Sequence, residues 1–246
     1  MKLVLSDSRF LKEPISVISE LVTEVKLKLN KDKIQLVAMD PANVAMIVFN
    51  LLSSSFIEYE TNNEEICVNL DNFKNILKRA KATDTLIIEL EKNKLKITIK
   101  GENTRTFNLA LIDLSTNEQK IPDLDFPIKI TTNTMLFDEA IEDMDVVSDS
   151  VNFILKDKKF IVNTEGNFSN ANVELTSGNE TVINTSVNDA KSKYSLEYLK
   201  KIIKASKFTN EVIIQFDKDY PLKIDYVIKD RLSLGFLLAP RVSNSD

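Results

Sequence analysis

The residues best suited to chemistry in this sequence are three acid-x-acid pairs. They are Asp123 with Asp125, Asp143 with Asp145, and Asp217 with Asp219. Two carboxylates at this spacing could hold Mg²⁺ for a metal-dependent hydrolysis. Such pairs are also common on solvated loops and helix faces, where they bind nothing. A Mg²⁺-dependent nuclease is therefore the third interpretation of the chain, and we expect no catalytic residue and no metal site.

Most other enzyme classes require residues that this chain does not contain. It has no histidine, which excludes a Ser-His-Asp triad, an imidazole general base and a histidine metal ligand. Its four glycines are isolated from one another, so neither a G-x-G-x-x-G turn nor a G-x-x-x-x-G-K-S/T loop can be written. The sequence indicates a protein that uses no nucleotide cofactor.

Lysines gather on two short segments, although the whole chain is acidic with a net charge of −5. They are Lys74, Lys78 and Lys81 in the first segment, and Lys200, Lys204 and Lys207 in the second. The spacing i, i+4, i+7 places such side chains on one face of an α-helix. A face of this kind suits the phosphate backbone of DNA, which is bound without reading the bases. A solvated helix face is the other interpretation.

The elements that must position these lysines occur twice. Residues 70–81 match residues 196–207 in apolar and charged positions at an offset of 126, and the same offset aligns 10–29 with 136–155 without a gap. An internal duplication explains so many matches at one offset. The expected domains are residues 1–118 and 128–246, with an interdomain connecting loop at 119–127.

Hydrophobic periodicity predicts helices followed by short strands. Apolar residues recur at helical spacing from Leu11 to Val22, and a second helix is expected at 71–81. Pro14 should lie near the start of the first helix, because proline is tolerated in the first turn. Strands are expected at 25–29, 34–39, 86–90 and 95–99. Short strands joined by polar turns favour antiparallel pairing, so the fold class is α+β, with antiparallel sheets covered on one side by four helices.

Composition places the chain among folded proteins inside the cell. With 43% hydrophobic and 28% charged residues it is not a disordered chain. No apolar stretch approaches the roughly 20 residues of a membrane helix, and the first residues do not form a secretory signal. A single cysteine, Cys67, excludes a disulfide framework.

Four short strings in the sequence are distinctive. They are VAMDPANVA at 37–45, QKIPD at 119–123, YPL at 220–222 and LLAPRV at 237–242. Together, and in this order, they resemble the sliding clamps of the proliferating cell nuclear antigen (PCNA) family, in an archaeal-like form, over essentially the whole chain. The resemblance implies the DNA clamp fold: two similar domains, in a subunit of a closed trimeric ring whose helices line a hole around duplex DNA. It implies no catalytic activity and no cofactor.

The resemblance also assigns roles by position. The residues it implies at the DNA-facing side are Lys12, Lys78, Arg79, Lys81, Lys204 and Lys207. Those it implies in a pocket for partner peptides are Met39, Val44, Ile121, Pro122, Pro221, Leu237, Leu238 and Ala239. The strands it implies between subunits are 104–111 and 167–175, with contacts at Phe107, Leu109, Leu111, Val173 and Leu175. The third helix departs from the family pattern, because it carries Asp138, Glu139, Glu142, Asp143 and Asp145.

The leading interpretation is a DNA polymerase processivity factor that tethers replication and repair enzymes to DNA. Its implied partners are duplex DNA bound without sequence specificity, other clamp subunits in a homotrimer or heterotrimer, DNA polymerase, flap endonuclease, DNA ligase and a clamp loader, and no membrane. Its location would be the cytoplasm or nucleoid of an archaeon, or the nucleus of a eukaryote. The alternative is a clamp-like subunit of a checkpoint or repair ring with weak DNA contacts, which the acidic third helix favours.

Overall fold

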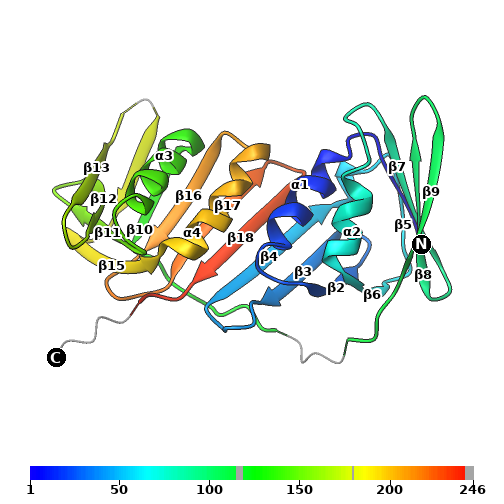
Figure 1. Cartoon of the computed structure of the whole chain (residues 1–246), viewed down its shortest axis with the longest axis horizontal. Helices are drawn as coiled ribbons and strands as arrows, with labels where there is room; N and C mark the ends of the chain where they lie inside the picture. Colours follow the sequence, from blue (N-terminus) through cyan, green and yellow to red (C-terminus); the bar gives the residue numbers. More distant parts are fainter. Residues whose placement is uncertain (115–118, 179, 242–246) are drawn as a thin grey trace. The chain divides into compact units, whose positions relative to one another are not determined.

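The computed structural model describes residues 1–114, 119–178 and 180–241, and the chain forms two compact units (Figure 1). Unit 1 comprises Met1–Pro41, Ile47–Ile121 and Ile228–Leu234, and unit 2 comprises Ala42–Met46, Pro122–Val227 and Gly235–Asp246. Each unit also includes one short segment from the other half of the chain, Ile228–Leu234 in unit 1 and Ala42–Met46 in unit 2. The expected end of the first domain at residue 118 lies outside the described residues.

The first half of the chain forms two helices, one 3₁₀ turn and nine strands. In chain order they are β1 (Lys2–Leu5), α1 (Arg9–Ile18), β2 (Glu24–Leu29), β3 (Lys33–Met39), β4 (Ala45–Leu52), η1 (Ser53–Ser55), β5 (Glu58–Glu60), β6 (Glu65–Asn69), α2 (Leu70–Leu77), β7 (Thr85–Glu91), β8 (Lys94–Lys100) and β9 (Thr104–Ala110). One sheet of unit 1 has the order β5-β1-β7-β8-β9 with antiparallel pairs throughout. Strand β9 is therefore an edge strand.

The second half repeats this plan with two more helices. In chain order its elements are β10 (Ile128–Asn133), α3 (Thr134–Asp145), β11 (Ser150–Lys156), β12 (Lys159–Glu165), β13 (Asn170–Thr176), β14 (Thr181–Thr185), β15 (Asp189–Ser195), α4 (Leu196–Ile202), η2 (Ile203–Phe208), β16 (Glu211–Phe216), β17 (Leu222–Ile228) and β18 (Leu232–Leu238). One sheet of unit 2 has the antiparallel order β13-β12-β11-β15, so β13 is an edge strand.

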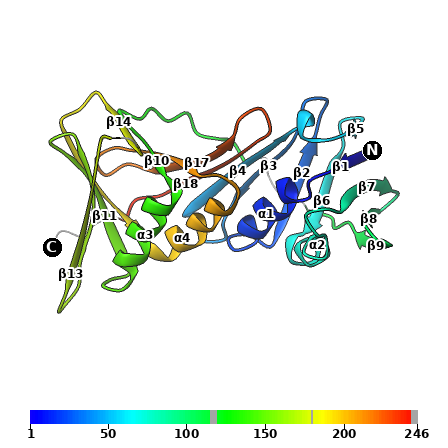
Figure 2. The same cartoon turned by 90° about the horizontal axis from the view of Figure 1, so that it is seen from above.

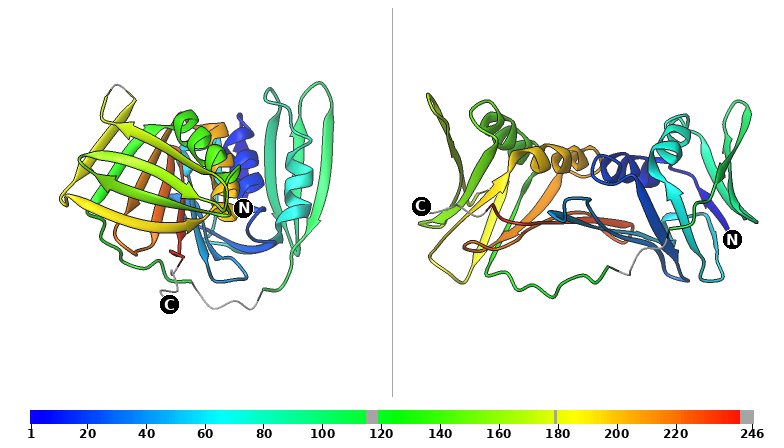
Figure 3. Two further views of the ribbon diagram at one scale, coloured as in Figure 1. Left: turned by 60° about the vertical axis from the view of Figure 1, so that its left-hand side comes forward. Right: turned by 60° about the horizontal axis from the view of Figure 1, so that its bottom comes forward.

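The helices pack in pairs within each unit. In unit 1, α1 lies beside α2, and in unit 2, α3 lies beside α4, on one face of the neighbouring strands (Figures 2 and 3). Asn69 caps α2 by accepting a hydrogen bond from the Asn72 amide at 3.0 Å. Within the described ranges these four are the α-helices, so the prediction of antiparallel sheets with four helices is confirmed.

The predicted ends of the lysine-bearing helices are wrong. Helix α2 ends at Leu77, and the amide groups of Arg79 and Ala80 bond to carbonyls three residues back, at 3.0 Å each. The backbone has therefore tightened into turns before it reaches Lys81. Helix α4 likewise changes at residue 203 into the 3₁₀ segment η2. Since a 3₁₀ helix has three residues per turn, residues three apart in η2 share a face.

The prediction for Pro14 is also wrong. Helix α1 begins at Arg9, so Pro14 lies in its interior, and its side chain is buried. Proline there removes one intrahelical hydrogen bond, but burial of the apolar ring offsets part of that loss. The helix stops at Ile18, and Leu21 is buried in the turn that follows, which made the helical pattern look longer than the helix. The strands predicted from alternation agree with β2, β3, β7 and β8.

Aromatic rings form the core of unit 2 around Phe153 of β11. The centroid of the Phe153 ring lies 6.0 Å from that of Phe137, 5.3 Å from those of Phe160 and Tyr194, and 6.1 Å from that of Phe216. All five side chains are fully buried. Edge-to-face rings of this kind add about 0.5–1.5 kcal/mol per pair to the burial of apolar surface. The cluster fixes α3 against the strands that follow it.

Phe153→Ala should lower the free energy of unfolding by about 3–5 kcal/mol, because it removes a buried ring and leaves a cavity among four others. Urea denaturation followed by circular dichroism measures the change. The matched control is Phe168→Ala, since Phe168 is fully exposed between β12 and β13 and its loss should cost less than about 0.5 kcal/mol. Equal effects of the two substitutions would contradict the assignment of this core.

Candidate functional site

The basic residues of unit 1 gather where α2 ends. Lys78 follows the last residue of α2 as its C-cap, Arg79 comes next, and Lys81 lies in the loop that leads to β7; all three side chains are exposed. The Lys81 ammonium lies 3.9 Å from the carboxylate of the exposed Glu102. By contrast, the Lys74 ammonium lies 3.2 Å from the Asp71 carboxylate and is largely covered. The structure thus brings together three of the predicted DNA-facing cations.

Lys12 lies on α1, and its side chain makes a contact within unit 1. Its ammonium donates a hydrogen bond to the carbonyl oxygen of Ala80 at 3.2 Å, and its side chain is half-buried. It therefore fastens α1 to the loop that follows α2. We assign Lys12 a part in holding that loop, in addition to any contact with a ligand.

The basic residues of unit 2 are fewer. Lys204 and Lys207 are exposed and lie three residues apart on η2, so they share one face of this 3₁₀ segment. The Lys200 ammonium lies 2.7 Å from the Asp145 carboxylate of α3, and the Lys201 ammonium lies 3.0 Å from Glu197. Acids of the same unit thus engage Lys200 and Lys201, while the side chains of Lys204 and Lys207 are exposed.

Helix α3 remains acidic in the folded unit. Glu139, Glu142 and Asp143 are exposed on it. Asp138 is half-buried, and burial raises the pKa of its carboxyl to about 6; the Glu142 carboxylate acts in the same direction, while a hydrogen bond with Ser206 opposes it. Exposed carboxylates repel phosphate groups, so the surface of α3 is unfavourable to a polyanion.

A hollow of about 730 Å³ in unit 1 contains two residues of the predicted peptide pocket, Met39 and Ile121. Ile121 is 48% exposed, which is unusual for a large apolar side chain. The remaining lining residues are Glu24, Val25, Lys26, Lys28, Gln35, Val37, Ala38, Glu65, Leu114, Gln119 and Lys120. Apolar walls with a charged rim suit an apolar peptide anchor. Sequence reasoning missed Val37 and Leu114, although the alternation of β3 could have indicated the former.

The other predicted pocket residues lie in unit 2. The Ala239 amide donates to the carbonyl of Val44 at 2.9 Å, which brings these two residues together. Pro122 is exposed, and Pro221 and Leu237 are partly exposed. Leu238 is fully buried. The Leu238 side chain therefore belongs to the core and is unavailable to a peptide, contrary to its predicted role.

The predicted subunit-contact strands are both edge strands, β9 in unit 1 and β13 in unit 2. Phe107 and Val173 are partly exposed on them. Leu109 and Leu175 are buried, so their side chains stabilise their own sheets. Leu111 follows the end of β9, and β13 begins only at Asn170. An edge strand keeps one row of backbone donors and acceptors available for another strand.

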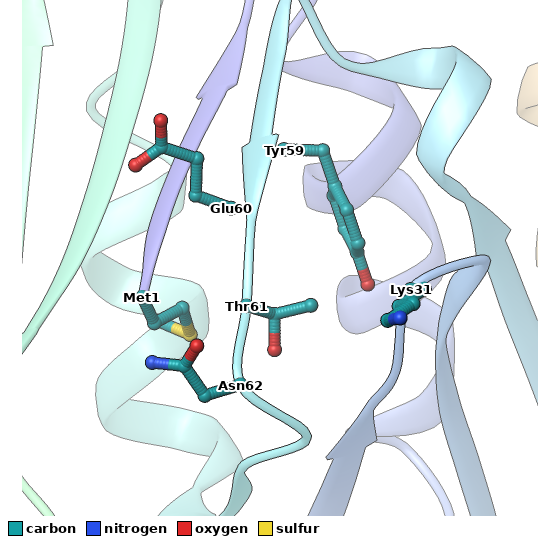
Figure 4. Close-up of a pocket in the computed structure, with 6 residues that line it drawn as sticks. All are labelled: Met1, Lys31, Tyr59, Glu60, Thr61 and Asn62. Carbon is teal, nitrogen blue, oxygen red and sulfur yellow. The ribbon is translucent and has the colours of Figure 1, made fainter.

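A further cavity of about 470 Å³ in unit 1 holds none of the predicted site residues (Figure 4). Its lining residues are Met1, Lys31, Tyr59, Glu60, Thr61 and Asn62. Burial raises the pKa of the Tyr59 phenol to about 12, so this group stays neutral, and Figure 4 shows its hydroxyl directed toward Lys31.

All three acid-x-acid pairs lie within the described ranges. No group of three or more acidic or cysteine side chains there is arranged to hold a metal ion. Among the same residues, no helix is long and apolar enough to cross a membrane.

Two family models together span the chain. The model described as "Proliferating cell nuclear antigen, N-terminal domain" matches residues 1–130, and "Proliferating cell nuclear antigen, C-terminal domain" matches residues 120–241. The chain belongs to the proliferating cell nuclear antigen family. Proteins named DNA polymerase sliding clamp from Pyrococcus horikoshii and Pyrococcus furiosus are each 40% identical to it over 231 residues, 93% of either chain.

Solved structures of this family have the same fold. The crystal structure of PCNA from Thermococcus kodakaraensis superposes with a TM-score of 0.92 at 30% identity, covering 98% of this chain and 99% of the other. One chain of the PCNA2–PCNA3 complex from Sulfolobus tokodaii gives a TM-score of 0.88 at 27% identity, with the same coverage. The predicted family and DNA clamp fold are therefore confirmed.

Proposed function

We propose that this chain is a DNA polymerase processivity factor, one subunit of a ring-shaped trimeric sliding clamp that encircles duplex DNA and tethers replication and repair enzymes. The observation that carries the proposal is the match to both domains of the PCNA family, with relatives named DNA polymerase sliding clamp. The chain would lie in the cytoplasm, at the nucleoid, where archaeal DNA is found. We propose the domains as residues 1–118 and 128–246, joined by the loop 119–127.

The mechanism is topological rather than chemical. A closed ring stays on DNA because it cannot dissociate sideways, while exposed ammonium and guanidinium groups make brief contacts with phosphates. Lys78, Arg79 and Lys81 are suited to this role, since they are exposed and can exchange one phosphate for the next at little cost. Reading of base sequence would need side chains directed into a groove, and none is required here. We infer that the chain catalyses no reaction itself.

Retention on circular DNA tests the proposal directly. The protein, loaded on a nicked circular duplex by a clamp loader, should stay bound during gel filtration and should be lost when the circle is cut once. Equal retention on circular and linear DNA would contradict topological binding. Cleavage of the DNA in the presence of Mg²⁺ would instead support the nuclease interpretation.

The second candidate is a subunit of a heteromeric ring, which could serve in checkpoint or repair work with weak DNA contacts of its own. Two observations favour it: the exposed acids of α3, and the similarity to a chain of the PCNA2–PCNA3 complex. Size-exclusion chromatography with light scattering distinguishes the candidates. A trimer of this chain alone supports the homotrimer, whereas a monomer that trimerises with related subunits supports the heteromer.

Ile121→Glu should weaken binding of partner peptides from DNA polymerase, flap endonuclease or DNA ligase by more than about tenfold, because a charge would replace an apolar contact in the hollow. Leu237→Ala should act in the same direction. Calorimetry with a peptide that carries an aromatic anchor measures the affinity. Ile57→Glu is the matched control, since Ile57 is exposed in unit 1 outside the hollow. Unchanged affinity in both pocket variants would place the peptide site elsewhere.

A further inference from the structure

The loop between α2 and β7 is fixed by an ion pair from another strand. Arg105 of β9 donates from Nη2 to Oδ2 of Asp84 at 2.7 Å, and from Nη1 to the carbonyl oxygen of Arg79 at 3.0 Å. The same Asp84 oxygen accepts the backbone N–H of Lys81 at 3.0 Å. One guanidinium and one carboxylate therefore hold the loop at both ends of its basic stretch.

The same loop is held from α1 as well. The Lys12 ammonium donates to the carbonyl of Ala80 at 3.2 Å, and the Ser8 hydroxyl donates to that of Lys81 at 3.4 Å. With Arg105 on Arg79, three consecutive carbonyl groups are each bound by a side chain, one from β9 and two from the start of α1. Three engaged carbonyl groups in a row leave this part of the loop little freedom.

The ion pair between Arg105 and Asp84 is largely buried. The Asp84 side chain is 4% exposed and that of Arg105 27%. A buried carboxylate must keep its partners, since an unpaired charge in this setting is costly. Gly101 leaves room for it, because a Cβ at that position would lie 2.1 Å from Oδ1 of Asp84. A side chain at position 101 would therefore displace the Asp84 carboxylate from Arg105.

We propose that Arg105 and Asp84 are positioning residues for DNA binding, which hold Lys78, Arg79 and Lys81 in the conformation that contacts phosphates. The inference rests on the proposed function, because it assigns these three cations to DNA. Neither residue contacts DNA itself. The guanidinium is needed as such, since a lysine ammonium cannot bond a carboxylate and a carbonyl in the same fixed geometry.

The direction in which Asp84→Asn changes DNA affinity distinguishes a positioning role from a purely electrostatic one. Asp84→Asn removes a negative charge close to the basic loop, so a purely electrostatic surface would bind DNA more tightly. The positioning account expects weaker binding, because a neutral amide oxygen replaces the charged carboxylate that holds both Arg105 and the Lys81 amide. Glu102→Gln provides the matched control: it removes the same charge 3.9 Å from Lys81, but its side chain is 94% exposed and outside the ion pair.

The experiment measures binding of the assembled protein to a fluorescent duplex over a range of salt, with assembly checked by light scattering. Asp84→Asn and Arg105→Lys should each weaken binding by about threefold to tenfold, while Glu102→Gln should leave it unchanged or slightly tighter. If Asp84→Asn binds as Glu102→Gln does, the proposal is overturned. Arg105→Lys keeps the positive charge and is the milder change. If Asp84→Asn does not fold, unchanged binding of Arg105→Lys overturns the proposal.

Trypsin supplies a readout that does not depend on DNA. Cleavage after Lys78, Arg79 and Lys81, followed by mass spectrometry, should be about tenfold faster in Asp84→Asn and Arg105→Lys than in the wild type or Glu102→Gln. Unchanged cleavage overturns the proposal. If the wild-type protein does not bind duplex DNA, the proposed function is wrong, and so is the role of the ion pair in DNA binding. The trypsin rates still show whether the ion pair fixes the loop.

Discussion

Phe107→Asp is expected to convert the assembled protein into soluble, folded monomers. Phe107 is partly exposed on β9, and β9 is the edge strand of its sheet. Joining of β9 to the other edge strand, β13, on a second copy would be head-to-tail, and such contacts close into a ring when the rotation allows. Aspartate at this position would place a charge in an apolar contact, so the subunit dissociation constant should rise by at least about 100-fold.

Light scattering after size-exclusion chromatography measures the assembly, and circular dichroism shows whether the monomer is folded. Asn108→Asp is the matched control, because it adds the same charge to the neighbouring residue, whose exposed side chain lies on the opposite face of β9. A trimer that persists in Phe107→Asp would show that β9 is not the contact strand. A wild-type chain that is already monomeric would instead favour a heteromeric ring.

The strands could be predicted from the sequence because their signal is local. In β2 the side chains alternate between the core and the surface, and in β8 the apolar residues recur at every second position. The sequence itself contains this period. The internal duplication then predicts the matching elements of the second half of the chain. The third helix was placed in the same way, and α3 spans Thr134–Asp145.

The helix ends could not be predicted, because distant residues set them. The turn after α2 depends on Asp84, which accepts the Lys81 amide, and on Arg105 of β9, the third element after the turn. No periodicity within 71–81 contains that information. Pro14 shows the same limit, since the local rule against interior proline was overruled by burial of its ring in the core.

The sequence predicts the exposed charged residues of the candidate site, but it does not show which apolar side chains are buried. Lys78 and Arg79 stand out in an acidic chain, and the structure leaves both exposed. Leu238 looked equivalent to Leu237 in the sequence, yet one is fully buried and the other partly exposed, as neighbours on a strand must be. Val37 and Leu114 joined the hollow through folding rather than through any motif.

Replacing the four outward lysines with alanine is expected to produce the largest loss of DNA binding. The variant combines Lys78→Ala, Lys81→Ala, Lys204→Ala and Lys207→Ala. Each phosphate contact contributes about 0.9 to the slope of log affinity against log salt, so affinity should fall by at least about tenfold at low salt and the slope should become shallower. Stability should change by less than about 1 kcal/mol, because exposed lysines contribute little to it.

Binding to a fluorescent duplex at several salt concentrations measures both quantities, and light scattering shows whether the ring still assembles. The matched control removes the same charge from exposed lysines elsewhere, namely Lys31, Lys191, Lys218 and Lys229. Lys78 and Lys81 should account for more of the lost affinity than Lys204 and Lys207. The reason is that η2 packs against α3, which carries Glu139, Glu142 and Asp143. Equal losses in the two quadruple variants would mean that DNA responds to net charge alone, and these lysines would then have no special place at the interface.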